Sequence, residues 1–275
     1  METDNGAPAS LAGFLGKQLR KHREERGWSQ TELAIKAHTT GAMISYVENA
    51  KRVLTEGLAG DIDGALGVDF FVELSPLVIA HAYPSWFLPY VELEREANAI
   101  RSFQSQIMPG LLQTEAYARA MLAAVRPDNL DDLVAARMTR QAVFERDEPP
   151  HTWFIVEEQV LRRRIGGLAV MRDQLQRLLS AMQHPRCVLQ IIPEEVAAHP
   201  GLAGPFTMLA FDQEQEDNPP HDVLYVDGFS RGRTVIDPTE VSEGARAYDL
   251  LRSYALSPEE SADRIGAYLE GLTKR

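Results

Sequence analysis

The sequence predicts an all-α bundle of five helices at the N-terminus, followed by an α+β domain whose small sheet is covered by helices. Three observations lead to this prediction. The 275 residues exceed a typical domain of about 100–200 residues. Apolar residues recur at helical spacing through residues 13–72, and the second half alternates β-rich runs with helical patterns. We expect a disordered tail at 1–12, the bundle at 13–72, a linker at 73–91 and the α+β domain at 92–275.

The composition indicates a soluble globular protein of the cytoplasm. Hydrophobic residues make up 44% of the chain and charged residues 25%, which excludes a wholly disordered protein. The single cysteine, Cys187, excludes a disulfide framework and any zinc site built on paired cysteines, and it fits a reducing compartment. No stretch reaches about 18 apolar residues, and the polar start METDNGAPAS lacks the basic and apolar regions of a secretory signal. We therefore expect no membrane partner.

Capping and turn residues predict where the helices of the bundle begin and end. The first helical pattern ends at Gly27, and Ser29 with Glu32 forms a capping box that starts the second. A threonine of the turn His38–Thr40 can cap the third helix. Two short helices joined by a tight turn form the geometry that presents a second helix to the DNA major groove. The helical patterns span 14–26, 30–37, 41–48 and 56–66, and Phe70 and Phe71 close the small core.

The charge of the bundle differs from that of the rest of the chain. The formal net charge of -12 argues at first against a nucleic-acid partner. Residues 14–52, however, carry eight basic and four acidic side chains, so this stretch is net +4 and the remainder is -16. A basic module on an acidic body can still contact phosphates, because charges beyond a Debye length of ~10 Å are largely screened. The basic residues are Lys17, Arg20, Lys21, Arg23, Arg26, Lys36, Lys51 and Arg52.

The run SQTELAIKAHTTGAMISYVENAKR resembles the helix-turn-helix of the phage-repressor class, often called the xenobiotic-response-element (XRE) family. The family pattern has Gln at the start of the second helix, Leu-Ala in its middle, Ile-Ser in the third helix and Glu-Asn at its end. These residues are Gln30, Leu33, Ala34, Ile44, Ser45, Glu48 and Asn49 here. The family usually has Gly where this chain has His38 and Ala50. A left-handed conformation at either position would cost roughly 1 kcal/mol.

The resemblance implies a DNA contact surface on these two helices and the loop that follows them. Phosphates would be held by Gln30, Asn49, Lys51 and Arg52, and base edges would face Thr40, Gly41, Ala42, Ser45 and Tyr46. Because Gly41 and Ala42 have no hydrogen-bonding side chain, we expect Tyr46, Ser45 and Thr40 to do most of the direct reading. The alternatives are a Tyr46 ring packed on the bundle edge and simple solvation of Lys51 and Arg52. One short reading helix gives modest specificity, so we expect a homodimer that reads two half-sites of double-stranded operator DNA.

The second half of the chain alternates helical and β-rich segments. Pro76, Pro84 and Pro89 exclude a continuous long helix before it. The acidic, proline-rich run 212–222 is expected to be an exposed, mobile hairpin connection. Together the segments predict an α+β domain. Helical patterns span 92–102, 113–125, 130–146, 168–182, 238–256 and 258–272, and β-rich runs span 151–156, 187–192, 205–211, 223–226 and 234–236.

Five further runs resemble an uncharacterised C-terminal domain that follows XRE helix-turn-helix modules in many actinobacterial regulators. They are PGLLQTEAYARA, EEQVLRRRIGG, MRDQLQRLLSAMQHPRCVLQIIP, GPFTMLAF and LRSYALSPEESADRI. Such regulators are commonly encoded beside a small companion protein, in arrangements described as antitoxin-like. The resemblance implies that this domain binds a companion protein encoded nearby and thereby changes operator occupancy. The alternatives are a repressor that holds a small-molecule ligand in this domain and an enzyme fused to a DNA-binding module.

The sequence lacks the common motifs for catalysis, metal binding and nucleotide binding. None of its seven histidines forms an H-x-x-x-H pair with an intervening Glu. No G-x-x-x-x-G-K-[ST] loop occurs, no G-x-G-x-x-G follows a predicted strand, and no G-x-S-x-G nucleophile elbow is present. We expect no catalytic residue, no metal site and no cofactor.

Four other features allow both a structural and a functional interpretation. Cys187 lies in an apolar strand, which favours a structural residue over a redox sensor. Glu157 and Glu158 fit the start of a helix better than a catalytic carboxylate pair. The run Arg162–Arg164 fits a solvated helix end better than a surface for an anionic partner. The sequence His199-Pro200-Gly201 predicts a rigid loop that can line a pocket.

Overall fold

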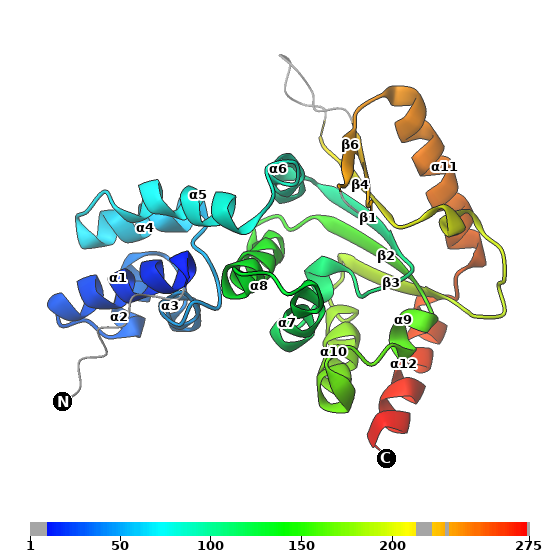
Figure 1. Cartoon of the computed structure of the whole chain (residues 1–275), viewed down its shortest axis with the longest axis horizontal. Coiled ribbons are helices and arrows are strands. Elements are labelled where there is room, and N and C mark those ends of the chain that lie inside the picture. Colours follow the sequence, from blue (N-terminus) through cyan, green and yellow to red (C-terminus); the bar gives the residue numbers. More distant parts are fainter. Residues whose placement is uncertain (1–9, 213–221, 229–230, 274–275) are drawn as a thin grey trace. The chain divides into compact units, whose positions relative to one another are not determined.

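Helices α1–α5 form the N-terminal bundle in the computed structural model, which describes residues 10–212, 222–228 and 231–273 (Figure 1). Each of the first four begins at a hydroxyl N-cap, whose oxygen accepts the backbone N–H three residues later. The predicted capping box of Ser29 and Glu32 is formed. Residues 1–9 of the predicted tail lie outside the described residues, and Leu11 and Ala12 already belong to α1. The helices span Leu11–Glu25, Gln30–Lys36, Gly41–Glu48, Glu56–Leu66 and Phe71–Ala82.

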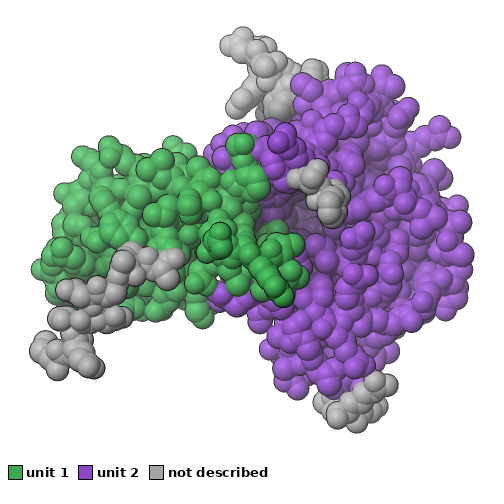
Figure 2. All heavy atoms as spheres, in the orientation of Figure 1, with its two compact units in different colours: residues 1–85, 122–139 green, residues 86–121, 140–275 purple. Residues whose placement is uncertain are grey.

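A sixth helix, from the middle of the sequence, belongs to the same compact unit as the bundle. The chain divides into two units, residues 1–85 with 122–139 and residues 86–121 with 140–275 (Figure 2). The sixth helix is α8, Leu130–Thr139, and its Ala135 is fully buried in the same apolar core as Leu19, Ile44 and Phe71. The expected single helix over 130–146 therefore divides into α8 and a 3₁₀ helix at Arg140–Glu145, which belong to different units.

The range 73–91, expected to be a linker, is largely helical. It contains most of α5, which continues through Pro76, and the first turn of α6, Leu88–Glu96. Pro89 lies in the first turn of α6, where its missing N–H would have had no partner within the helix. Residues 83–87 separate the two helices, so the range does not form one continuous helix.

Six strands form one mixed sheet in the second unit, in the order β3-β2-β1-β4-β5-β6. Strands β1, β2 and β3 are parallel, with Phe154 opposite both Ser102 and Leu189, and the remaining pairings are antiparallel. Each of the five predicted β-rich runs overlaps one strand; β2 extends one residue beyond its run and β6 begins one residue before its run. The predicted α+β architecture is confirmed. The strands span Ala99–Gln104 (β1), His151–Glu157 (β2), Cys187–Ile192 (β3), Phe206–Ala210 (β4), Val223–Val226 (β5) and Arg233–Val235 (β6).

The strand β1 contradicts the helical pattern expected at 92–102. Helix α6 ends at Glu96, and β1 begins two residues after Ala97. The apolar residues Ala97, Ile100 and Phe103 recur every three positions, which imitates one face of a helix. A strand between two neighbours and beneath helices on both sides is buried on both faces, so the alternation that marks a strand is lost.

Helices cover both faces of the sheet (Figure 1). On one face, α10 (Gly167–Ala181) and α12 (Pro258–Thr273) contribute Leu175 and Ile265 to a core that also contains Phe154. On the other face, α11 (Pro238–Tyr254) contributes Tyr248 to a core that also contains Ile155. Neighbouring residues of β2 enter opposite cores because successive strand side chains point to opposite faces. The remaining helices are α7 (Glu115–Leu122) and the short α9 (Gln159–Arg162).

Three further observations concern one loop, membrane-spanning helices and metal-binding groups. The predicted hairpin connection at 212–222 joins antiparallel strands β4 and β5, and its residues 213–221 lie outside the described residues. Throughout the part of the chain that the structure describes, no helix is long and apolar enough to cross a membrane. Within the same residues, no group of three or more His, Cys, Asp or Glu side chains is placed to hold a metal ion.

Candidate nucleic-acid interface

The helix-turn-helix consists of α2, the turn at residues 38–40 and α3. Helix α3 buries Ile44, Val47 and Glu48 against the bundle. Its opposite face therefore points away from the core, and residues three, four and seven positions apart share that face. Four of the predicted DNA contacts lie there: Ala42, Ser45, Tyr46 and Asn49.

The start of α3 depends on its first two residues. The hydroxyl of Thr40 is the N-cap and accepts the N–H of Met43 at 3.1 Å. A Cβ on Gly41 would lie 3.3 Å from the Oγ1 of Thr31 in α2, so the two helices approach each other closely at this point. Gly41 therefore has a packing reason to be small, in addition to the base-facing position implied by the resemblance.

Both positions where the family pattern has glycine adopt the left-handed backbone conformation. His38 has a φ of 49°, and Ala50, which follows α3, has a φ of 55°. The left-handed region is crowded for a residue with a Cβ, and glycine populates it freely. The turn geometry of the family is thus retained here with residues that are strained by it.

A buried carboxylate connects α1, α2 and α3. The side chain of Glu48 is fully buried and accepts hydrogen bonds from Arg23 at 2.5 and 3.0 Å, from Gln30 at 2.8 Å and from Arg20 at 3.4 Å. Burial raises the pKa of Glu48, but the hydrogen bonds from Arg23 and Gln30 and the two positive charges outweigh it and lower the pKa. The hydrogen bond to Glu48 raises the pKa of Arg23 despite burial. This network fixes the end of α3 on α1.

The network continues onto the exposed face of α3 through Asn49. Arg20 donates to the Asn49 Oδ1 at 3.2 Å, and the Asn49 amide donates to the Ser45 carbonyl at 2.7 Å. Gln30, expected to contact a phosphate, turns its amide nitrogen toward Glu48. Gln30 is therefore held by Glu48 directly, and Asn49 is linked to Glu48 through Arg20.

The residues after α3 place a cation beside the exposed aromatic ring. The guanidinium of Arg52 lies 5.5 Å from the centroid of the Tyr46 ring and contacts the Met43 sulfur at 4.0 Å. Tyr46 remains 43% exposed, and Lys51 is exposed. The structure therefore brings Tyr46 and Arg52 together at one end of α3.

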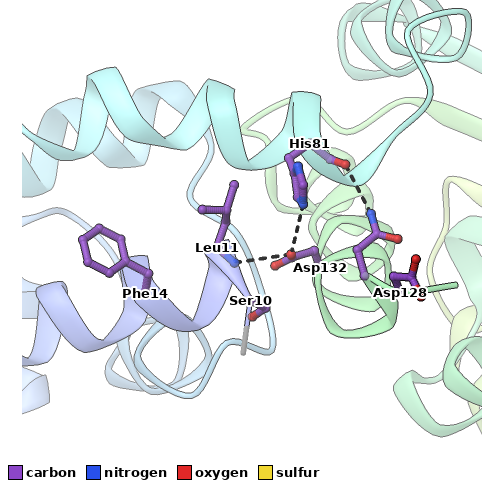
Figure 3. Close-up of a pocket in the computed structure, with 7 residues that line it drawn as sticks. Ser10, Leu11, Phe14, His81, Asp128 and Asp132 are labelled. Atoms are coloured by element: carbon purple, nitrogen blue, oxygen red, sulfur yellow. Dashed lines mark hydrogen bonds and ion pairs between the residues drawn. The ribbon is translucent and has the colours of Figure 1, made fainter. Parts of the chain in front are cut away.

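Helix α8 holds two parts of the bundle, which the sequence reasoning missed. The buried carboxylate of Asp132 accepts the N–H groups of Leu11 and Ala12 at 3.3 and 2.9 Å, and His81 lies 4.0 Å from it (Figure 3). Asp132 thus supplies acceptors to the free N–H groups at the start of α1. The hydroxyl of Thr139 accepts the N–H of Val53 at 2.8 Å. No local signal identifies these contacts, because Asp132 and Ala12 are 120 positions apart in the sequence.

An open hollow of about 720 Å³ lies beside Asp132. His81 and Asp132 both line it and point toward each other in Figure 3, and the Asn129 amide donates to the His81 carbonyl at 3.2 Å. Leu11 and Phe14 form its apolar wall, and none of the predicted DNA-contact residues lines it.

In the second unit, Glu157 and Glu158 have different partners. Glu158 is buried and accepts hydrogen bonds from Arg264 and Tyr268 at 2.7 and 2.8 Å, which is a structural pairing. Glu157 lies 3.4 Å from the Nε2 of His199, whose Nδ1 accepts the N–H of Gly201 at 3.2 Å. A cavity of about 180 Å³ lies here, at the carboxyl ends of β2 and β3, and the loop predicted to line a pocket does line it.

The structure also bears on Cys187, which is buried, and on the basic run Arg162–Arg164. Burial raises the pKa of the Cys187 thiol, which keeps it protonated and poorly reactive. Arg162, the first residue of the predicted basic run, forms an ion pair with Glu194. Arg163 and Arg164 are exposed, so part of the run is solvated.

Comparison with known families gives two matches along the chain. Residues 15–73 match a family model described as Helix-turn-helix domain. Residues 87–267 match a model described as Domain of unknown function (DUF5753), which covers more than half of the chain. Comparisons with curated proteins and with solved structures give no match. The resemblance to a helix-turn-helix regulator with an uncharacterised C-terminal domain is confirmed by the two family matches.

Proposed function

The chain belongs to the family described as Domain of unknown function (DUF5753), with a helix-turn-helix domain before it, and we propose that it is a sequence-specific DNA-binding transcriptional regulator. The observation that carries this proposal is the exposed face of α3, which ends in the stacked pair Tyr46 and Arg52. An exposed helix face with hydrogen-bonding and aromatic side chains fits the major groove of DNA, and a neighbouring cation fits the phosphates beside it.

In this proposal, the two kinds of contact come from different residues. Tyr46, Ser45 and Thr40 read base edges, and the Ala42 methyl packs on a thymine methyl, with Gly41 allowing close approach. Phosphates are bound by Asn49, Lys51, Arg52 and Gln30. Because the Glu48 network already orients Asn49 and Gln30, little side-chain freedom is lost when DNA binds.

We propose that the protein binds its operator as a homodimer. The face of α3 offers few base-reading side chains, and two-fold repetition doubles the number of contacts on half-sites about 34 Å apart. Sedimentation of the free protein and of its DNA complex measures the number of chains in each. Two chains on a palindromic site support the proposal, and one chain per site contradicts it.

We further propose that the second unit binds a small companion protein encoded nearby, as the resemblance of its five sequence runs to antitoxin-like regulators implies. A small-molecule ligand is the second candidate, and the observation that favours it is the cavity beside Glu157 and His199 at the carboxyl ends of parallel strands, where α/β sheets commonly bind ligands. Co-expression with the product of the adjacent gene separates the two. A stable complex that changes operator affinity supports the companion, and failure to co-purify contradicts it.

Selection of binding sites from a pool of random duplex DNA tests the proposed function. Wild-type protein is expected to enrich one motif. Tyr46→Ala should lose about 1–3 kcal/mol of discrimination at the bases that it reads, whereas Lys51→Ala should weaken binding to all sequences alike. Ile35→Ala is the matched control, because Ile35 is a large apolar residue of α2 that is 70% exposed and outside the predicted surface. Absence of any enriched motif, or equal effects of all three substitutions, contradicts the proposal.

A further inference from the structure

The loop between α3 and α4 carries two of the proposed phosphate contacts, Lys51 and Arg52. The strained Ala50 lies near its start, and after Arg52 the loop contains Val53, which is 3% exposed, and Leu54, which is fully buried. A buried residue needs partners for both of its backbone polar groups. The position of Lys51 and Arg52 therefore depends on how Val53 is held.

A side chain from a distant part of the sequence holds the backbone of Val53. The Oγ1 of Thr139 accepts the Val53 N–H at 2.8 Å, and the same hydroxyl lies 3.2 Å from the Val53 carbonyl and 2.8 Å from the Ala135 carbonyl, to which it donates. The Thr139 hydroxyl thus supplies the acceptor for the backbone N–H of Val53, next to Arg52. Thr139 is the last residue of α8, whose Ala135 is fixed in the core.

The residue after Thr139 is anchored within the second unit. The guanidinium of Arg140 donates two hydrogen bonds of 2.7 Å to the buried carboxylate of Glu94. It also lies 5.4 and 5.6 Å from the rings of Phe87 and Tyr90. Two consecutive residues are therefore fixed, one in each unit, and a single peptide bond joins them.

We propose that Thr139 is a positioning residue for DNA binding, which holds the Val53 backbone so that Lys51 and Arg52 reach phosphates. The inference rests on the proposed function. Thr139 ends α8, the helix whose Ala135 lies in the core of the bundle. The family match at 87–267 includes this helix, so the boundary between the two matched families is not the boundary between the folded units.

The test is a double-mutant cycle on the salt dependence of operator binding in the full-length protein. Thr139→Val keeps the shape of the side chain and removes the hydroxyl. It should lower the slope of log K against log salt by about one to two, because each phosphate contact contributes about 0.9. Thr139→Ser restores the hydroxyl and should restore the slope. In an Arg52→Ala background, Thr139→Val should change the slope by less than in wild type, because the contact that it positions is already gone.

Thr152→Val is the matched control, because the Thr152 hydroxyl also donates to a backbone carbonyl, but in the second unit, to Arg186 just before β3. It should leave the slope unchanged. If wild-type protein binds with a steep slope and Thr139→Val has the same slope, Thr139 only stabilises the fold and the inference fails while the proposed function stands. If the effects of Thr139→Val and Arg52→Ala on the salt slope are fully additive, the inference is contradicted as well. If wild-type protein shows no salt-dependent DNA binding, the proposed function itself fails.

Discussion

Replacing His38 by glycine should stabilise the helix-turn-helix unit. His38 has a φ of 49° and an exposed side chain, so the substitution relieves strain and removes no buried surface. The left-handed conformation costs an L-residue about 1–2 kcal/mol, and the extra freedom of glycine in the unfolded chain offsets about 0.4–1 kcal/mol of the relief. The expected net gain is about 0.5–1 kcal/mol.

Tryptophan fluorescence during urea unfolding can measure this gain in stability in the first unit, which contains His38. Trp28 lies in the first unit, and the other two tryptophans, Trp86 and Trp153, lie in the second. Replacing those two by Phe leaves Trp28 as the reporter. The urea midpoint should rise for His38→Gly with the slope unchanged.

Gly67→Ala is the opposite control. Gly67 ends α4 with a φ of 67°, and nothing lies within 4 Å of an added Cβ, so only backbone strain is introduced. It should lower stability by about 1 kcal/mol. A lower midpoint for His38→Gly, or equal midpoints for wild type and both variants, would refute the reasoning from backbone strain. Ala50→Gly should gain less than His38→Gly, because the Ala50 methyl also packs against the core.

Three further predictions concern the contacts that hold the bundle together. Gly16→Ala should cost about 1–3 kcal/mol, because the new Cβ would lie 2.4 Å from the Val47 carbonyl oxygen; thermal unfolding without a lower midpoint would contradict the close approach of α1 and α3. Asp132→Ala should cost about 1–3 kcal/mol by leaving two N–H groups of α1 without acceptors, and amide exchange at the start of α1 should become faster; unchanged exchange there would exclude the capping contact. Glu48 has a pKa below its ordinary value of 4.5, so its stabilising contribution is present above that pH and is lost as the pH falls below it. Glu48→Gln should remove this acid sensitivity and cost about 3 kcal/mol at neutral pH, because it leaves the buried Arg23 with only the exposed carboxylate of Glu24, at 3.4 Å; a variant as acid-sensitive as wild type would contradict the assignment.

Local sequence signals predicted the local parts of the fold. The capping box of Ser29 and Glu32, the hydroxyl of Thr40 before α3 and the β-rich runs all act within a few residues, so their effect is visible in the sequence. The departure from glycine at His38 and Ala50 pointed to two strained turns, and both have positive φ. All of these features depend on residues that are close together in the sequence.

Long-range contacts were not predictable in the same way. Asp132 and Thr139 act on α1 and Val53, which lie about 120 and 86 positions away in the sequence, and their residue types are ordinary for a helix. The family pattern included Glu48, but nothing in its spacing indicated the buried ion pair with Arg23, because the partner comes from another helix. The strand β1 was assigned to a helix because a doubly buried strand has no alternating pattern.

The salt dependence of binding to DNA from the protein's own upstream region tests the central claim most directly. The account predicts tight binding of the full-length protein with a steep slope, and a slope lower by about 0.9 for Arg52→Ala, which removes one phosphate contact. A protein that binds neither this DNA nor a random pool at low salt, with or without the companion protein, would contradict the account and leave α3 as part of a protein-interaction bundle.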